Sequence, residues 1–380
     1  MAKKSKNSNI GGDKLPFVSI CTPTFNRRPF IPIMFECFKN QTYPRSKMEW
    51  IIVDDGSDKI GDLVKNSGIS QIKYISLPKK ITLGEKRNVM HKHAKGSIIV
   101  YMDDDDYYPP ERVSHAVQKL LDNPSALCGG CSEMYIYFKH IHKMYQSGPF
   151  GPNHATAATF AFRSELLKQT QYDNSASLAE ECAFLKNYTI PFVQFDPLKT
   201  ILVFSHIQNS FDKRKLLEYG ESAVLKQSEK TVDMFIRESF EIPIKKFFME
   251  DIDSLLIEYS PGDPKNKPDV IEQTAEIEKK RKQMNDESGF IMLQQPGKEP
   301  TKLSQQDVVN ILQQQQQHIH NLTESVQKLE TRNKNLEDQL NLMEMLVSVN
   351  GERKKEEKKE DITVLMTPKS KSEPEVYVKI

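Results

Sequence analysis

The sequence predicts an α/β protein with a mostly parallel sheet, followed by a helical extension and a C-terminal coiled coil. Three observations support this fold class: short β-rich runs alternate with helical patterns up to residue 210, a helical segment of mixed charge follows, and a heptad repeat lies near the C-terminus. Alternating strands and helices form parallel sheets, because each crossover helix returns the chain to the end where the previous strand began. Such sheets bind ligands at the carboxyl ends of their strands.

The first part of the chain supplies the central strands. Each predicted strand has a core of β-branched or aromatic residues and ends in polar or turn-forming residues. Pro29 and Pro109 suit the first turn of a helix, where the missing N–H needs no partner. The expected strands cover residues 17–22, 49–54, 72–76 and 97–102, and the expected helices cover residues 29–40, 83–95 and 109–121.

Shorter elements follow Leu127. Together with the first strands they make a predicted domain of residues 15–210, which is long enough to enclose one hydrophobic core. The expected elements are a hairpin of residues 133–138 and 141–145, strands at 159–162 and 199–204, and a helix at 178–188.

The remaining segments are expected to lie outside this domain. The proline-rich break Ser260–Pro268 predicts the start of a linker. The expected segments are a flexible basic N-terminus (1–14), a helical extension (211–259), a polar linker (260–300), a coiled coil (301–350) and a charged, disordered tail (351–380).

Two sets of residues repeat every seven positions near the C-terminus. With β-branched residues or leucine at most a positions, leucine at most d positions and one buried asparagine, the repeat favours a parallel two-stranded coiled coil. We therefore expect a parallel homodimer through residues 308–347; a single amphipathic helix packed on the domain is the alternative. The a positions are Leu312, Ile319, Val326, Asn333, Leu340 and Val347, and the d positions are Val308, Gln315, Leu322, Leu329, Leu336 and Met343.

Composition argues against several classes of protein. The 53 Lys and Arg residues nearly balance the 52 Asp and Glu residues, so no charge excess indicates a nucleic-acid partner. No stretch approaches the roughly 20 apolar residues that a membrane span requires, and no apolar core follows the basic N-terminus as in a secretory signal. The odd number of cysteines, 5, does not resemble a disulfide framework. We expect a cytoplasmic protein.

The strongest chemical signal is the acidic run Asp103–Asp106, between a predicted strand and a predicted helix. Adjacent carboxylates repel one another unless a cation compensates them. In an extended chain Asp103 and Asp105 point to the same side, where their oxygens suit Mg²⁺ or Mn²⁺. A solvated acidic turn is the alternative.

Other polar residues end the neighbouring strands. Thr22–Asn26 ends the first predicted strand and Asp54–Ser57 the second, where a carboxylate can bind a nucleobase or ribose hydroxyl. Lys86 and Arg87 offer cations for phosphate or base contacts. Taken singly, these segments are also typical of an ordinary turn and of a solvated helix face.

Taken in order, these segments resemble the family 2 nucleotide-sugar glycosyltransferases, which have the Rossmann-like GT-A fold. Each segment alone is weak, but the four in register are specific, and they cover about the first third of the chain. The matching segments are Val18-Ser-Ile-Cys-Thr-Pro-Thr-Phe-Asn26, Ile52-Val-Asp-Asp-Gly-Ser57, Gly84-Glu-Lys-Arg-Asn88 with Ala94-Lys-Gly-Ser97, and Met102-Asp-Asp-Asp-Asp106.

The resemblance implies roles for individual residues. It implies that Asp54 contacts the base, Thr22 the nucleoside and Arg87 the nucleotide, and that Asp103 and Asp105 form a DxD-type site for metal and ribose. Further candidates that it suggests are Pro23, Asn26 and Asp104 for the donor nucleotide and His206 as a metal ligand, with a structural histidine as the alternative at position 206.

The resemblance also implies a catalytic base. Family members often carry a Glu-Asp pair on a helix, in which the second acid accepts the acceptor's proton. Glu181 takes that place here, one methylene longer than aspartate, and Glu180 is the second candidate.

We therefore expect a hexosyltransferase-type enzyme that moves a sugar from a nucleoside diphosphate sugar, with UDP expected, to a hydroxyl of a glycan, protein or lipid. The resemblance implies dependence on Mn²⁺ or Mg²⁺ and inversion by single displacement. A catalytically inactive scaffold with this fold and a coiled coil is the alternative. A nucleotidyltransferase fits less well, because Thr22–Asn26 has no glycine for a phosphate-binding loop.

Overall fold

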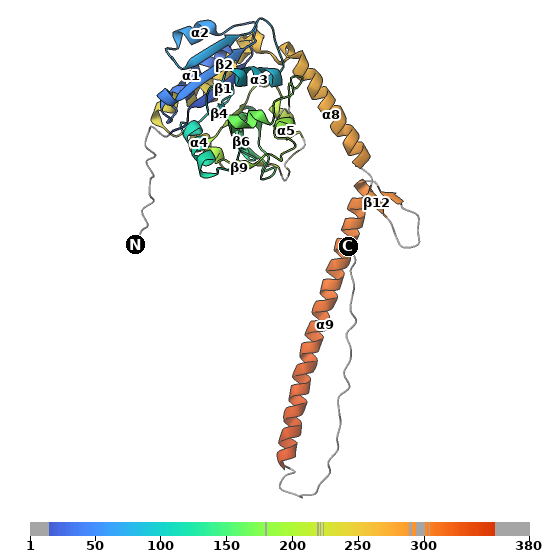
Figure 1. Cartoon of the computed structure of the whole chain (residues 1–380). Helices are drawn as coiled ribbons and strands as arrows, with labels where there is room; N and C mark the ends of the chain where they lie inside the picture. Colours follow the sequence, from blue (N-terminus) through green and yellow to red (C-terminus); the bar gives the residue numbers. More distant parts are fainter. Residues whose placement is uncertain are drawn as a thin grey trace, which may run out of the picture. The chain divides into compact units, whose positions relative to one another are not determined.

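In the computed structural model, residues 15–178, 181–218, 220, 222, 224–288, 291–293, 301–303 and 305–353 are described. The chain forms two compact units, residues 1–281 and residues 282–380. The first unit contains the sheet that the sequence predicted, and the second contains a long helix (Figure 1).

A seven-stranded sheet in the order β3-β2-β1-β4-β8-β5-β9 forms the centre of the first unit. All pairs are parallel except those that β8 makes with β4 and β5, so the predicted α/β class with a mostly parallel sheet is confirmed. The strands are β1 (Val18–Thr24), β2 (Met48–Asp54), β3 (Ile72–Ser76), β4 (Ile98–Tyr101), β5 (Cys128–Gly130), β8 (Ala161–Arg163) and β9 (Phe192–Gln194).

Helices cover both faces of this sheet, as expected for right-handed crossovers. Alternate residues of β1 enter different cores: Ile20 packs with Phe38 of α1, whereas Cys21 packs with Met90 of α3. The helices of the first face are α1 (Ile31–Lys39), α2 (Gly61–Asn66) and α4 (Arg112–Asp122), and those of the second are α3 (Leu83–His93) and α5 (Glu181–Phe184).

Trp50 is the centre of the first core. Its ring stacks on Phe38 with 4.5 Å between centroids and meets Phe35 edge-on, and its indole N–H donates to the Thr22 hydroxyl at 2.8 Å. A buried tryptophan needs such a partner for its polar nitrogen. The hydroxyl of Thr22 is therefore committed to the core rather than to a cavity.

A second sheet of four strands, in the order β10-β6-β7-β11, adjoins the first. The predicted hairpin is confirmed, because β6 and β7 pair in antiparallel register. The predicted strand at 199–204 is shorter than expected. The strands are β6 (Met134–Phe138), β7 (Lys143–Ser147), β10 (Val203–Ser205) and β11 (Leu225–Gln227).

The helix expected over residues 178–188 is much shorter in the described chain. The helix α5 contains only Glu181–Phe184, and Ala179 and Glu180 lie outside the described residues. Three successive residues, 186–188, take left-handed backbone angles with φ from 49° to 61°. A right-handed helix cannot continue through such angles, so the chain turns there toward β9.

The helical extension is part of the first unit and packs into its first core. It comprises α6 (Ile242–Lys246) and α7 (Ile252–Glu258), with a π-helical turn between them. Phe248 stacks on Phe204 at 4.4 Å, and the Tyr107 hydroxyl donates to Glu241 at 2.7 Å. Residues 211–241 contain short 3₁₀ turns and β11 instead of the expected helix, because β11 extends the second sheet by pairing with β7.

The segment expected to be a polar linker contains a helix. Two 3₁₀ turns, Ser260–Gly262 and Pro264–Asn266, lead into α8 (Pro268–Ser288), whose first residue is the proline that suits a helix start. The prolines that suggested a break thus shape an ordered turn and a helix start. The boundary between the two units falls inside α8.

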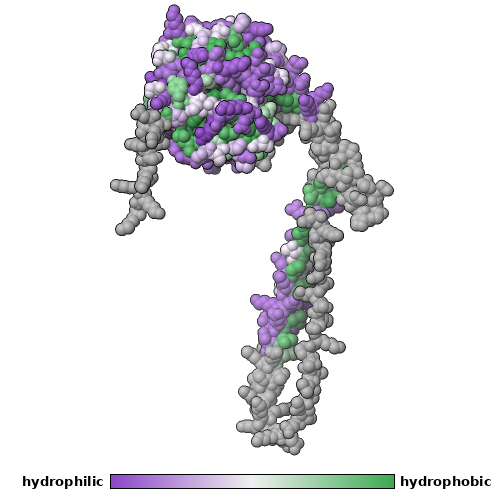
Figure 2. All heavy atoms as spheres, in the orientation of Figure 1, coloured by the Kyte–Doolittle hydropathy of each residue, from purple (hydrophilic) through white to green (hydrophobic). Residues whose placement is uncertain are grey.

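The second unit consists of a small hairpin and a long helix. The hairpin pairs β12 (Ile291–Leu293) with β13 (Thr301–Leu303), and the helix α9 spans Gln305–Arg353. Figure 2 shows hydrophobic side chains at the surface along α9. Eight heptad residues are at least half exposed: Leu312, Ile319, Leu322, Val326, Leu329, Leu336, Leu340 and Met343. In the described part of the chain, no helix is both long and apolar enough to cross a membrane.

The contact between Phe38 and Trp50 gives a test of this core. Phe38 is 1% exposed, so Phe38→Ala should lower the free energy of unfolding by about 3–5 kcal/mol through lost burial and an unfilled cavity. Urea unfolding followed by the fluorescence of Trp50, the single tryptophan, measures this. Phe240→Ala, at a site 54% exposed, is the matched control and should change stability by less than about 0.5 kcal/mol. Equal stability of the two variants would contradict the packing described.

Candidate functional site

The strand order reverses beside β1, which has β2 on one side and β4 on the other. Connections leave such a point in opposite directions and open a crevice at the carboxyl ends of the strands. A cavity of about 150 Å³ lies there, lined by Pro23 and Thr24 from the end of β1 and by Asp103–Asp105 after β4. Topology therefore brings two of the predicted motifs together.

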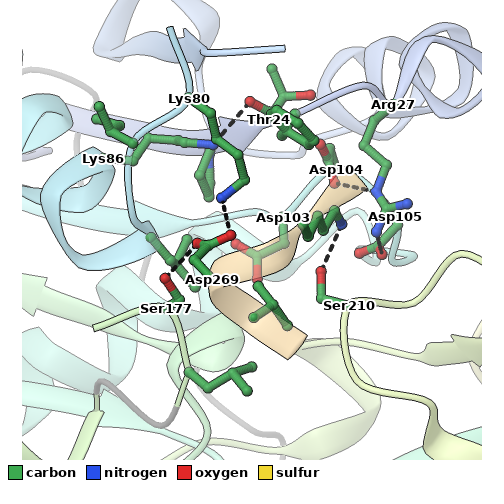
Figure 3. Close-up of a pocket in the computed structure, with 17 residues that line it drawn as sticks. Thr24, Arg27, Lys80, Lys86, Asp103, Asp104, Asp105, Ser177, Ser210 and Asp269 are labelled. Atoms are coloured by element: carbon green, nitrogen blue, oxygen red, sulfur yellow. Dashed lines mark hydrogen bonds and ion pairs between the residues drawn. The ribbon is translucent and has the colours of Figure 1, made fainter. Parts of the chain in front are cut away.

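Charged side chains of both signs line this cavity (Figure 3). The cations come from segments far apart in the chain: the loop after β1, the segment before α3, α3 itself and the start of α8. The cations are Arg27, Lys80, Lys86 and Lys267, and the carboxylates are Asp103, Asp104, Asp105 and Asp269.

Three of the four carboxylates of the acidic run lie near an arginine of the chain itself. Arg27 lies 3.6 Å from Asp104 and 3.1 Å from Asp105, and Arg87 lies 3.7 Å from Asp103. The run bends instead of remaining extended, so Asp103, Asp104 and Asp105 all reach the cavity. The expectation that alternate carboxylates would share one side was too simple, because it assumed a straight strand.

Burial and neighbouring charges together give these acids different pKa values. Burial, with the neighbouring Asp105 carboxylate, raises the pKa of Asp104 to about 7 even though Arg27 opposes the shift. Burial also disfavours ionised Asp105, but Arg27 and His206 outweigh it and hold the pKa of Asp105 well below its usual range. Burial and then Asp105 raise the pKa of Asp106 well above normal. The site therefore holds a firmly ionised carboxylate among acids that resist ionisation.

The predicted ligand His206 contacts the acidic run. Its Nε2 lies 3.3 Å from the Asp105 carboxylate and 2.8 Å from the Asn209 side-chain nitrogen, and its ring packs on Phe30 at 4.9 Å. Burial lowers the pKa of His206 to about 4, although Asp105 favours the charged ring. The imidazole is thus neutral near pH 7, the form that can bind a metal.

Arg87 is buried against the second face of the sheet. Its guanidinium lies 4.3 Å from the centroid of the Tyr101 ring and 5.7 Å from that of Tyr172, which are cation–π distances. Through its approach to Asp103, Arg87 connects this aromatic cluster to the acidic run.

Four predicted donor-binding residues lie outside the lining of the cavity: Thr22, Asn26, Asp54 and Arg87. The carboxylate of Asp54 accepts hydrogen bonds from the backbone N–H groups of Gly56 and Ile60 and from the Tyr74 hydroxyl. Asn26 has a left-handed backbone, with φ of 52°, and its amide accepts from the backbone N–H of Asp58. In the structure the side chains of Asp54 and Asn26 therefore shape the turns beside the cavity.

Sequence reasoning missed a buried ion pair at the same edge. Lys86 contacts the Asp55 carboxylate and donates to the Thr24 carbonyl oxygen at 3.1 Å. The other oxygen of Asp55 accepts from the backbone N–H of Ile81 at 2.8 Å. Burial lowers the pKa of Lys86 despite this partner. The available signal was the second aspartate of Asp54–Ser57 together with Lys86.

The predicted base Glu181 is the first residue of α5, and Leu178, three residues earlier, lines the cavity. The negative charge of Glu181 contributes, after burial, to raising the pKa of Tyr188. Tyr188 packs on His154, which in turn packs on Phe150, with centroids 4.9 and 4.8 Å apart. Glu181 thus lies near an aromatic cluster, whereas Glu180 lies outside the described residues.

The start of α8 also reaches the cavity, which sequence reasoning did not foresee. Lys267, Asp269 and Val270 line it, and Asp269 pairs with Lys80 and accepts from the Ser177 hydroxyl at 2.6 Å. No local pattern signals this contact, because it joins residues 189 and 92 positions apart.

The residues present fit a hard divalent cation only in part. Among the described residues, no three His, Cys, Asp or Glu side chains form a ready-made metal centre, so Asp103, Asp105 and His206 are not grouped as one. Mg²⁺ and similar ions commonly bind through one or two carboxylates and complete their coordination with substrate phosphates and water. The carboxylate oxygens of Asp103 and Asp105 at one cavity fit that mode.

Comparison with known proteins indicates the family that this chain resembles. Residues 19–186 match the family model described as Glycosyl transferase family 2. An uncharacterized glycosyltransferase of Haemophilus influenzae is 33% identical over 108 residues, which is 28% of this chain and 36% of that protein. The poly(ribitol-phosphate) β-N-acetylglucosaminyltransferase TarS of Staphylococcus aureus is 30% identical over 105 residues, which is 26% of this chain and 18% of TarS.

Solved structures are more distant. A mannosyltransferase from Pyrobaculum calidifontis, in complex with GDP-Man and Mn²⁺, has 18% identity and a TM-score of 0.41 over 50% of this chain and 57% of that one. TarS residues 1–349 in complex with UDP-GlcNAc have 17% identity and a TM-score of 0.38 over 49% and 58% of the two chains.

Residues 19–186 match the family 2 model, in agreement with the resemblance of the four motifs. The chain spans about a third of the Haemophilus relative and less than a fifth of TarS. The helical extension and α8, which closes one side of the cavity, lie beyond the matched segment.

The ion pair of Lys86 and Asp55 can be tested by stability. Lys86→Met should lower the free energy of unfolding by about 3–5 kcal/mol, because it leaves a buried carboxylate without its cation. Urea unfolding measures the loss, and Lys92→Met on the exposed side of α3 is the matched control. Adding Asp55→Asn to Lys86→Met should recover part of the stability. A double variant that is less stable than Lys86→Met would contradict the role given to the pair.

Proposed function

We propose that this protein transfers a hexosyl group from a nucleoside diphosphate sugar, a UDP-sugar in our expectation, to a hydroxyl acceptor. The observation that carries the proposal is the cavity at the strand-order reversal, where Asp103–Asp105 face the lysines of the same cavity within a family 2 domain. The name of the relative TarS, an N-acetylglucosaminyltransferase, supports a sugar nucleotide as donor.

The donor would bind with its diphosphate among the cations of the cavity. Lys80 and Lys86 lie on one side of it, and Asp103 and Asp105 offer oxygens to Mn²⁺ or Mg²⁺ on the other (Figure 3). Such an ion, when bound, neutralises charge that develops on the leaving diphosphate. The guanidinium of Arg87, which lies outside the cavity lining, is 3.7 Å from the Asp103 carboxylate. Because this contact already positions the carboxylate, it needs little reorganisation when the donor binds.

The acceptor would lie toward α5. There Glu181 would take the proton of the acceptor hydroxyl while that oxygen attacks the anomeric carbon. The bond from the anomeric carbon to the diphosphate oxygen breaks in the same step, and the electron pair leaves with the nucleoside diphosphate. A single displacement of this kind inverts the anomeric configuration. Glu180 is the second candidate for the base, and a glycan, a protein or a lipid would carry the hydroxyl.

We also propose that α9 forms a parallel homodimer through residues 308–347. Eight heptad side chains are at least half exposed along α9, and Asn333 occupies a central a position, where a buried asparagine fixes the register of two strands. A second copy of the same helix is the occupant that matches this repeat. The protein would work in the cytoplasm, where its five free cysteines remain reduced.

Nucleotide binding and transfer test the proposed reaction. UDP with Mn²⁺ should raise the melting temperature of the wild type, because a ligand that binds the native state stabilises it. Asp105→Asn should lose this Mn²⁺-dependent rise. Glu181→Gln should keep it but lose sugar transfer from a UDP-sugar at least about 100-fold, measured by UDP release with an acceptor panel.

Two conservative variants control for the loss of a negative charge. Asp122→Asn and Glu165→Gln change exposed acids and should behave as the wild type in both assays. GDP, CDP and ADP run beside UDP identify another donor base. If none of the four diphosphates shifts the melting temperature of the wild type, the enzyme proposal is wrong and the scaffold alternative gains.

The dimer has a separate test. Leu329→Asp with Leu336→Asp puts charges into the predicted interface, so the mass in solution should fall from twice 43.8 kDa to 43.8 kDa in size-exclusion chromatography with light scattering. Lys328→Asp with Asn335→Asp, one residue earlier in each heptad, should leave the dimer intact. A wild type of 43.8 kDa refutes the homodimer.

A further inference from the structure

The segment Tyr259–Gln273, called the strap below, crosses from the helical extension to the cavity. At its start the Tyr259 hydroxyl donates to Asp58 at 2.8 Å, and the Asn26 side chain donates to the Pro261 carbonyl at 2.9 Å. The Gln208 side chain donates to the Tyr259 carbonyl at 2.6 Å. The strap is therefore fastened to the loop after β1, to the turn after β2 and to the segment after β10.

The end of the strap is fastened on the opposite side of the cavity. Gln273 accepts from the backbone N–H of Ser177 at 2.8 Å and donates to the Ser175 carbonyl at 2.7 Å. Asp269 contacts Lys80. With contacts at both ends, the residues between them have a fixed place in the cavity wall.

Lys267 is the cation that the strap brings into this wall. The residue is 6% exposed, and its ammonium donates to the Ser210 hydroxyl at 2.8 Å. Arg27, Lys80 and Lys86, the other cations of the cavity, each contact a carboxylate.

The hydrogen bond described for Lys267 goes to a neutral acceptor instead. An ammonium has three N–H donors, so this bond leaves donors for a ligand. Burial lowers the pKa of Lys267 to about 7, and Arg27 and Lys86 add to the shift, whereas the carboxylates of Asp105 and Asp104 oppose it. Burying a cation costs free energy of folding when the contact described for it is a neutral hydroxyl. An anion bound in the cavity would offset that cost.

We propose that Lys267 is a donor-binding residue whose ammonium contacts the diphosphate of the nucleotide sugar, and that the strap serves to hold it there. The inference rests on the proposed function. It adds a donor-binding residue that lies outside the family-matched segment, which ends at residue 186. A diphosphate carries the anionic oxygens that satisfy the remaining donors of an ammonium.

Isothermal titration of the full chain tests the role of Lys267. UDP, inorganic pyrophosphate and uridine, each with Mn²⁺, are titrated into the wild type, Lys267→Ala and Lys267→Gln. Both variants should bind UDP and pyrophosphate about tenfold to hundredfold more weakly, the effect of losing a charge-assisted hydrogen bond. The affinity for uridine should stay the same, because uridine has no phosphate.

Lys265→Ala is the matched control. Lys265 lies two residues earlier, its side chain is 75% exposed, and it pairs with Asp263 outside the cavity lining. It should bind all three ligands as the wild type does. Melting curves without ligand show which of the two Lys267 variants is folded, and Lys267→Gln keeps most of the side chain should Lys267→Ala fail to fold.

The outcomes separate this inference from the proposed function. If the wild type binds no nucleoside diphosphate and no pyrophosphate, the proposed function is wrong, and the inference is wrong with it. If the wild type binds UDP and both Lys267 variants bind it equally well, only the inference is overturned. An equal loss of UDP and uridine affinity also overturns it, because Lys267 would then maintain the shape of the cavity instead of contacting phosphate.

Discussion

The compensation of the buried acidic run by distant cations is the constraint on which the site depends. Carboxylates removed from water are costly unless cations or hydrogen-bond donors replace the water. For Asp103–Asp105 those partners are Arg27 from the loop after β1, Arg87 from α3 and His206 after β10. The acidic run therefore connects three separate parts of the domain.

The cavity that results is charged but balanced. Its lining carries four basic and four acidic side chains, so the cavity offers groups of both signs to a ligand. A diphosphate and a divalent cation together bring charges of both signs, which suits such a lining. The matched segment supplies most of these groups, whereas Lys267 immediately precedes α8 and Asp269 lies in its first turn. Lys267, Asp269 and Val270, which lie beyond the matched segment, are thus part of the cavity wall.

Sequence reasoning predicted the four central strands and the acidic run, because both leave local marks: β-branched runs that end in turns, and adjacent carboxylates after a strand. It overestimated the helix that carries Glu181, because the left-handed residues 186–188 have no glycine to reveal them. It treated Ser260–Pro268 as a break, although these prolines begin an ordered strap. In both places the backbone follows tertiary contacts that local propensity does not record.

The sequence by itself determined that a mostly parallel α/β domain places carboxylates at a sheet edge and that a heptad repeat follows, because periodicity and turn residues act over short distances. Only the tertiary structure decided which side chains meet there. Asn26 and Pro261, joined by a hydrogen bond, are 235 positions apart, and Lys86 reaches Asp55 across the sheet edge. Contacts of this kind depend on how distant segments pack together. No regular spacing of residues in the sequence reveals them.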